Sequence, residues 1–425
     1  MSVSPSFAEA TKVWARIGCL SFGGPAGQIA LMHREIVDER KWLSEQQFLS
    51  ALNFCMLLPG PEAMQLATYA GWRLHGVKGG LMAGLLFVLP GAFVVLALSM
   101  LYAAFGNLPW IEAIFFGVKS AVLAIVIEAL LRVARRALKG NVDWLIAGVA
   151  FLALYCFDVP FPLIIIAAGL VGFFRSSTAD TSPSTARPTF TALFSTTALW
   201  AAIWLIPLAL LAITLGMNHV LTKIGIFFSQ LAVVTFGGAY AVLSYMAQAA
   251  VEQHGWLTAP EMIDGLALAE TTPGPLILVT QFVGYFAALR GMGGIWGGLA
   301  GAAVTLWMTF APCFLWIFAG APYIEHISRM PRLSGALAAI TAAVVGVILN
   351  LSLWFGLHVL FARVNRMEGL FKPWLPDWQT LDLAALVITL IAAFALLRLH
   401  LGIPKTLALC AGVGLFWKLA IQGLT

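Results

Sequence analysis

The sequence has very little charge for its length. Of its 425 residues, 24 are Lys or Arg and 19 are Asp or Glu, so charged residues make up only 10% of the chain. Soluble proteins carry about 25% charged residues, which they need to cover a water-facing surface. Hydrophobic residues make up 61% of the chain, and the mean hydropathy is +0.92. The composition excludes a soluble globular protein and indicates a chain that is mostly surrounded by lipid.

The sequence motifs of common enzymes are absent as well. The five cysteines form no CxxC pair, and the seven histidines show no metal-ligand spacing. There is no GxxxxGK[ST] loop, no strand-bound GxGxxG and no HExxH. We therefore expect no cofactor, no metal ion and no enzymatic reaction. The net charge of +5 implies no nucleic-acid partner, because basic residues in the short loops of a membrane protein act as orientation signals.

Long apolar runs recur along the whole chain. A helix that crosses a membrane needs about 20 apolar residues, and most of the runs reach or approach that length. They lie at residues 80–104, 110–131, 142–157, 161–174, 190–215, 293–320, 333–361, 381–398 and 403–421. The pattern predicts an all-α polytopic membrane protein that has the lipid bilayer as a partner.

The chain also contains an internal repeat at a constant offset of 214 residues. The matching motifs are SFGGP at 21–25 with TFGGA at 235–239, WLSEQQF at 42–48 with WLTAPEM at 256–262, and PGP at 59–61 and at 273–275. A polar segment, RSSTADTSPSTARP, separates the two copies. We expect an N-terminal repeat at 1–174, a cytoplasmic linker at 175–189 and a C-terminal repeat at 190–425.

Helix breakers interrupt the first two apolar segments of each copy. In the first copy, Gly23-Gly24-Pro25 interrupts residues 8–37 and Pro59-Gly60-Pro61 interrupts residues 44–76. Backbone without helical hydrogen bonds is stable at membrane depth only where it is buried in protein or lines a wet cavity. Four breaks at matching positions therefore predict broken or re-entrant helices that meet near the bilayer midplane at a transport site.

The number of spans sets the relative orientation of the copies. Five predicted spans lie between the two broken pairs, and an odd number inverts the second copy in the membrane. The most basic loop, residues 132–139, is expected to be cytoplasmic, which also places the N-terminus in the cytoplasm. The sequence thus predicts two inverted-topology repeats.

The breaks are suited to binding an anion. The N-terminus of each half-helix exposes free N–H groups and the positive end of the helix dipole. Uncharged hydroxyl and amide side chains cluster around the same positions. The candidate substrate-binding residues are Ser21, Gly23, Gly24, Gln28, Gly60, Glu62, Gln65, Lys119, Thr235, Gly237, Gly238, Thr271, Thr272, Gly274 and Gln281.

Lys119 is the charge that most needs a partner. It lies near the middle of the span 110–131, where a lysine costs roughly 2.5–3.5 kcal/mol to insert. Glu112 lies on the same helix face but about 10.5 Å away along the axis, too far to pair directly. We consider two partners, an anionic substrate or a structural carboxylate such as Glu62. Glu62 and Glu270, each close to a PGP break, either compensate a dipole or carry a proton.

Small residues recur at four-residue spacing in the run GGIWGGLAG, residues 293–301. Such a face permits close approach of another helix, either within the fold or in a homodimer.

The motifs resemble those of the chromate ion transporter family, in its long form with two homologous halves. The residues that carry the resemblance are LPGPEAMQLATYAGW at 58–72, GLLFVLPGAF at 84–93, ETTPGPLILVTQFVGY at 270–285, SFGGPAGQIA at 21–30 and TFGGAYAVL at 235–243. The resemblance implies a bacterial inner-membrane transporter that exports chromate and confers chromate resistance. It implies a membrane potential or a proton gradient as the driving force and no ATPase partner. Two alternatives remain open, a carrier of sulfate or another small oxyanion and a membrane-embedded oxidoreductase that acts on chromate.

Overall fold

The computed structural model describes residues 5–22, 24–106, 108–176, 190–236, 239–324, 330–367, 369, 371–418 and 420. Gly23, Gly237, Gly238 and residues 177–189 of the predicted linker lie outside these ranges. Among the described residues, helices form nearly all the regular structure, and five of them are long and apolar enough to cross a membrane. The predicted all-α polytopic membrane fold is confirmed.

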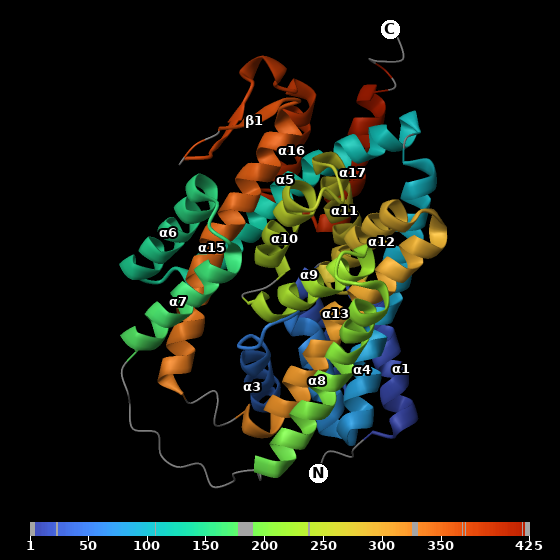
Figure 1. Cartoon of the computed structure of the whole chain (residues 1–425), viewed down its shortest axis with the longest axis vertical. Helices are drawn as coiled ribbons and strands as arrows, with labels where there is room; N and C mark the ends of the chain where they lie inside the picture. Colours follow the sequence, from blue (N-terminus) through green and yellow to red (C-terminus); the bar gives the residue numbers. More distant parts are fainter. Residues whose placement is uncertain are drawn as a thin grey trace. The chain divides into compact units, whose positions relative to one another are not determined.

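The chain forms two compact units, each built from several separate stretches of sequence (Figure 1). Unit 1 contains Met1–Ser99, Ser176–Ala239 and Thr272–Ser334, and unit 2 contains Met100–Arg175, Tyr240–Thr271 and Gly335–Thr425. Each unit therefore takes segments from both halves of the sequence. The units are spatial clusters, whereas the predicted halves are sequence repeats, so the two divisions describe different properties of the chain.

Unit 1 holds the first broken pair, part of the second and the helices that pack on them. Its elements are α1 (Phe7–Leu20), α2 (Gly24–His33), η1 (Arg34–Glu39), α3 (Glu45–Cys55), most of α4 (Glu62–Phe105), α8 (Phe190–Leu215), α9 (Val220–Val234), η3 (Leu276–Leu278), α12 (Val279–Met292), α13 (Gly294–Gly320) and η4 (Ala321–Tyr323). Within this unit α13 packs against α8, α9 and α12.

Unit 2 is built around α5, α16 and α17, which pack on one another. Its elements are α5 (Pro109–Ala137), α6 (Asn141–Phe157), α7 (Phe161–Arg175), α10 (Ala239–Gln248), η2 (Ala249–Gln253), α11 (Ala259–Thr271), most of α15 (Pro331–Leu360), β1 (Val364–Arg366), β2 (Trp374–Pro376), η5 (Trp378–Thr380), α16 (Leu383–Leu397) and α17 (Ile403–Trp417). The antiparallel hairpin β1–β2, which follows α15, was not expected from the sequence.

Local chemistry sets several of the helix boundaries. Ser44 and Gln47 form a capping box at the start of α3, with both reciprocal hydrogen bonds present. Glu261 accepts a bond from the Thr258 N–H at 2.8 Å at the start of α11, and its own N–H donates to the Thr258 hydroxyl at 3.4 Å. Both boxes follow the S/T-x-x-E/Q pattern of the sequence.

The duplication extends to irregular details of the backbone. The π-helices η1 and η2 begin 215 residues apart, at Arg34 and Ala249, close to the repeat offset. After them, Trp42 N–H donates to the Ile36 carbonyl and Trp256 N–H to the Ala250 carbonyl, both at 2.8 Å and at an offset of 214. Two segments that share the same uncommon helix type and the same loop bond adopt one local fold.

The small residues of α13 are used inside unit 1. A methyl group on Gly298 would lie 2.5 Å from the Tyr285 ring, and a methyl on Gly297 would lie 2.8 Å from the Ala288 carbonyl. Both partners belong to α12, so these glycines allow α12 and α13 to pack closely. Because α12 occupies this face, the small-residue run gives no support to the predicted homodimer.

Candidate functional site

The breaks after α1 and α9 have the same conformation. Ser21 has φ −77° and ψ 68°, and Thr235, at the repeat offset, has φ −76° and ψ 76°. The Ser21 hydroxyl donates to the Ile17 carbonyl and the Thr235 hydroxyl to the Leu231 carbonyl, each at 2.6 Å. Each hydroxyl therefore satisfies a carbonyl in the last turn of its own helix, and each turns the chain in the same way.

The breaks of the two copies are joined by reciprocal backbone hydrogen bonds inside unit 1. Gly60 N–H donates to the Thr235 carbonyl at 2.7 Å, and Gly274 N–H donates to the Ser21 carbonyl at 2.8 Å. Gly274 is Gly60 plus 214 and Thr235 is Ser21 plus 214, so the two bonds are equivalent under the repeat. The structure thus brings Ser21, Gly60, Thr235 and Gly274 together, as expected of breaks that form one site.

Two glutamine side chains complete this cluster. Gln28 Nε2 donates to the Gly274 carbonyl at 2.6 Å, and Gln65 Nε2 donates to the Pro59 carbonyl at 2.6 Å. Neither glutamine recurs at the repeat offset, where the second copy has Val242 and Val279. The two glutamines therefore make the cluster asymmetric in spite of its symmetric backbone.

The cluster is closed in this conformation. Ser21, Gln28, Gln65 and Thr235 each expose 1% or less of their surface. The N–H groups of Gly60 and Gly274 and the amide nitrogens of both glutamines already donate to carbonyls. An oxyanion could use these donors only after the carbonyls are released, so the structure corresponds to an occluded form of the site.

The other predicted residues near the breaks have mixed positions. Gly24 begins α2 with φ +69°, Glu62 is the first residue of α4, and Gln281 is buried on α12. The Gln65 and Gln281 side chains each have an Oε1 atom that is buried without a hydrogen-bond partner among the described residues. Thr272 is buried at its break. Thr271 is exposed at the end of α11 in unit 2, where its hydroxyl donates to the Leu268 carbonyl.

Lys119 has a carboxylate partner within unit 2. Its Nζ lies 3.1 Å from Oδ2 of Asp264 on α11, and the Tyr102 hydroxyl donates to the same oxygen at 2.6 Å. The Asp264 side chain is 5% exposed, whereas that of Lys119 is 25% exposed. The structural pair that the sequence left open is therefore present, with Asp264 and not Glu62 as its acid. The Oδ1 atom of Asp264 is buried and has no hydrogen-bond partner in the described part of the chain.

A second buried carboxylate lies on α11 as well. Glu270 is 7% exposed and accepts a hydrogen bond from the Tyr240 hydroxyl at 2.7 Å. Counting 1.5 Å per residue from Ala259, Glu270 lies about 16 Å into the helix, close to half of a 30 Å hydrocarbon core. Sequence reasoning missed Asp264 and Tyr240. Ionisable residues within apolar helices mark functional positions, and that signal could have identified Asp264.

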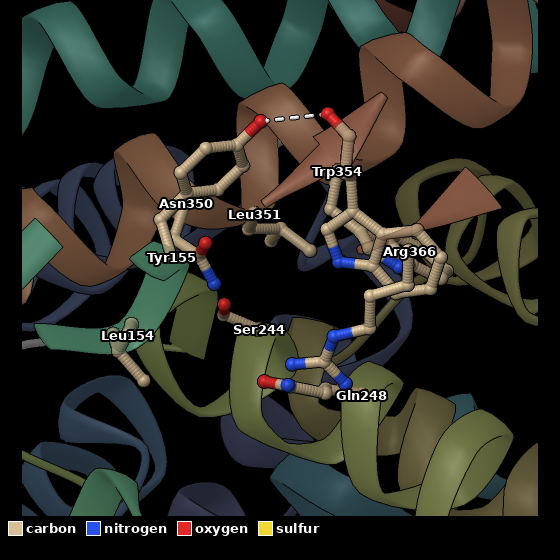
Figure 2. Close-up of a pocket in the computed structure, with 9 residues that line it drawn as sticks. Leu154, Tyr155, Ser244, Gln248, Asn350, Leu351, Trp354 and Arg366 are labelled. Carbon is tan, nitrogen blue, oxygen red and sulfur yellow. Dashed lines mark hydrogen bonds between the residues drawn. The ribbon is translucent and has the colours of Figure 1, made fainter. Parts of the chain in front are cut away.

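Unit 2 also encloses a small polar cavity of about 10 Å³. Figure 2 shows Tyr155, Ser244, Gln248, Asn350 and Arg366 around it, with the guanidinium group of Arg366 beside Gln248. A volume of this size holds about one water molecule, so the cavity is too small for a tetrahedral oxyanion. Arg366 of β1 binds Asp158 at 3.0 Å and Glu252 at 2.7 Å, which ties the hairpin to η2 and to the end of α6. The role of this cluster is structural.

Repeated broken helices whose interrupted backbones bond to one another in a polytopic α-helical chain define a protein of the membrane transporter class. The chain belongs to the chromate transporter family, because the family model described as "Chromate transporter" matches residues 8–173 and 222–415. The predicted family is confirmed, and the two matched regions correspond to the two copies of the repeat.

Several relatives share the full arrangement. A chromate transport protein of Pseudomonas aeruginosa is 36% identical over 78% of this chain and 77% of its own length. One of Cupriavidus metallidurans is 31% identical over 78% of both chains. A probable chromate transport protein of Synechococcus elongatus is 29% identical over 88% of this chain and 92% of its own. No solved structure matches the chain.

Proposed function

We propose that this protein is a secondary active transporter that exports chromate across the bacterial inner membrane and so confers chromate resistance. The observation that carries the proposal is the pair of breaks that repeat at an offset of 214 and bond reciprocally, in a chain of this family. The relatives named as chromate transport proteins support chromate as the substrate. The protein acts as a carrier and catalyses no reaction.

Chromate is a tetrahedral dianion, and the breaks provide the groups that such an ion requires. Each half-helix N-terminus supplies roughly half a positive charge, so two opposed ends supply about +1. The sequence-based expectation added Lys119 to reach +2, but Asp264 now offsets that charge. A dianion bound at two half-helix ends is therefore only partly neutralised, and it binds more tightly if substrate competes with Asp264 for Lys119.

The closed cluster suggests how the site opens. In the occluded form Gly60 and Gly274 donate their N–H groups to Thr235 and Ser21. In the binding form the same two amides donate to chromate oxygens, and the rigid helices on either side rotate as the carbonyls separate. Exchanging one acceptor for another costs little, because the number of hydrogen bonds is conserved. Glu62 and Glu270 are the candidate acids if a proton gradient, and not the membrane potential alone, drives export.

The reciprocal bonds also support the inverted arrangement of the repeats. Contacts of the form i to j′ and j to i′ arise from a two-fold relation between two copies. With an odd number of spans between the copies, that axis lies in the membrane plane. We infer that the N-terminus is cytoplasmic and that the linker 175–189 lies on the same side.

Cysteine labelling in intact cells tests this topology. In a cysteine-free background, a single cysteine at Lys139 should react only after the membrane is permeabilised, and one at His254 should react with an impermeant maleimide added outside. Equal labelling of both positions from the outside would contradict the inverted repeat.

Chromate flux in membrane vesicles tests the transport function. Everted vesicles that contain the protein should accumulate chromate when an inside-positive potential is imposed, and right-side-out vesicles should not. Sulfate in tenfold excess should compete weakly if chromate is the preferred oxyanion and strongly if the protein is a general oxyanion carrier. Reduction of chromate by the purified protein, together with cofactor absorbance bands, would instead identify an oxidoreductase.

A further inference from the structure

A basic groove lies at the C-terminal end of α5, within unit 2. It encloses about 600 Å³ and is lined by Glu128, Leu131, Arg132, Arg135, Arg136, Leu396, Leu397 and His400. The first five come from α5, and the last three come from the end of α16 and the turn that follows. All of these residues belong to unit 2, whereas the reciprocal breaks belong to unit 1.

The groove combines a charged rim with an apolar floor. Arg132, Arg135 and Arg136 are exposed, and Glu128 forms an ion pair with Arg132. Leu131 and Leu397 are 41% and 44% exposed, which is unusual beside three guanidinium groups in water but normal for a surface that faces lipid. The groove is therefore amphipathic along its depth.

The length of α5 places this rim in the headgroup layer. The helix has 29 residues, which correspond to about 43 Å at 1.5 Å per residue. A hydrocarbon core of about 30 Å leaves the last turns of such a helix outside the acyl region. The arginines therefore lie at the depth of phospholipid phosphates, while the leucines below them lie at the depth of the acyl chains.

The net charge of the groove selects the ligand. Three arginines and one glutamate sum to +2. The C-terminal ends of α5 and α16 contribute roughly −0.5 each, which leaves about +1. Dipole compensation and membrane orientation account for basic residues at a helix end, but neither requires a hollow of this volume with an apolar floor. A monoanionic phosphodiester with acyl chains matches the charge, the depth and the lining together.

We propose that this groove binds the headgroup of an anionic phospholipid, such as phosphatidylglycerol, with its phosphate on the arginines and its glycerol and first methylenes against Leu131, Leu396 and Leu397. A zwitterionic lipid binds more weakly, because its cationic headgroup approaches the same guanidinium groups. The proposal is independent of the transported ion, since none of its residues belongs to the reciprocal breaks.

Native mass spectrometry of the full-length protein tests the site. The parent protein, purified with mixed phosphatidylglycerol and phosphatidylcholine, should retain phosphatidylglycerol selectively. Replacing two arginines, as Arg135→Gln with Arg136→Gln, should weaken that retention about thirtyfold, since each basic residue near an anionic lipid contributes comparably. Lys139→Gln is the matched control. It removes a charge from the same loop but does not line the groove, so retention should be unchanged.

Two further results decide between the possible ligands. In the unmodified protein, a photoreactive phosphatidylglycerol should label peptides that contain residues 128–136 and 396–400, which does not depend on any variant folding. Labelling elsewhere, or equal retention in the double variant, would overturn the proposal. Protection of the groove by inorganic phosphate or chromate alone, at concentrations that leave the lipid bound elsewhere, would identify a site for a soluble anion instead.

Discussion

Replacing Gly60 or Gly274 by alanine should reduce chromate transport about tenfold or more, although the protein still inserts and purifies normally. Both residues have backbone angles that side chains disfavour, with φ +121° at Gly60 and φ +91° at Gly274. A residue with a Cβ costs roughly 1–3 kcal/mol in such a conformation, and that strain is placed where the backbone must also exchange hydrogen bonds.

Steric contact adds to the strain at both positions. A Cβ on Gly60 would lie 2.7 Å from Nε2 of Gln65, the atom that donates to the Pro59 carbonyl, and 3.0 Å from Sγ of Cys313. A Cβ on Gly274 would lie 3.3 Å from the Gly91 Cα of α4 and 3.0 Å from Cδ1 of Leu278. Each alanine therefore displaces part of the cluster that closes the breaks.

Two glycines elsewhere in the chain provide matched controls. Gly148 of α6 and Gly412 of α17 are helical, and among the described atoms an added Cβ at either would meet nothing within 4 Å. Alanine at these positions should leave transport unchanged and stabilise the helix by roughly 0.5–1 kcal/mol. The measurement is chromate uptake into everted vesicles at equal protein content. Parental rates in both Gly60→Ala and Gly274→Ala would mean that the breaks are architectural and that the site lies elsewhere.

The elements that local chemistry dictates could be predicted from the sequence. The breaks at Pro59-Gly60-Pro61 and Pro273-Gly274-Pro275 follow from the missing proline donors, and the capping boxes follow from spacing alone. The structure adds that α4 continues through the expected boundary near residue 76 as a kink, with non-helical angles at His75 and Gly76. Local patterns identify such a change of direction but not whether the chain turns or only bends.

The contacts that build the candidate site were beyond local patterns. The bond from Gly60 to Thr235 joins residues 175 positions apart, and the pair of Lys119 with Asp264 joins residues 145 apart. The sequence showed that Lys119 needed a partner, because a mid-span charge is costly, but several acids could have supplied it. The hairpin that carries Arg366 gave no signal, since its two strands are three residues each and are held by ion pairs with distant loops.

Lys119→Gln should lower chromate transport by about ten- to hundredfold, the effect of removing one charge-assisted hydrogen bond to an anion. The single variant alone is ambiguous, because it also leaves Asp264 buried without its cation. Removing one partner of a buried ion pair destabilises a protein by roughly 3–5 kcal/mol, and the partial exposure of Lys119 reduces that figure here. Lost transport in this variant could therefore reflect a damaged fold.

The double variant Lys119→Gln with Asp264→Asn separates the two roles. It removes both charges, keeps two side chains of similar size and lets the Tyr102 hydroxyl still donate to the amide oxygen that replaces the carboxylate. If Lys119 binds the substrate, the double variant regains the thermal stability of the parent but not its transport, and Lys119→Arg retains part of the activity. If Lys119 serves only to neutralise Asp264, the double variant regains both. Vesicle uptake and thermal unfolding, measured on the same preparations, give these two outcomes separately, and recovery of parental uptake in the double variant would remove Lys119 from the binding site.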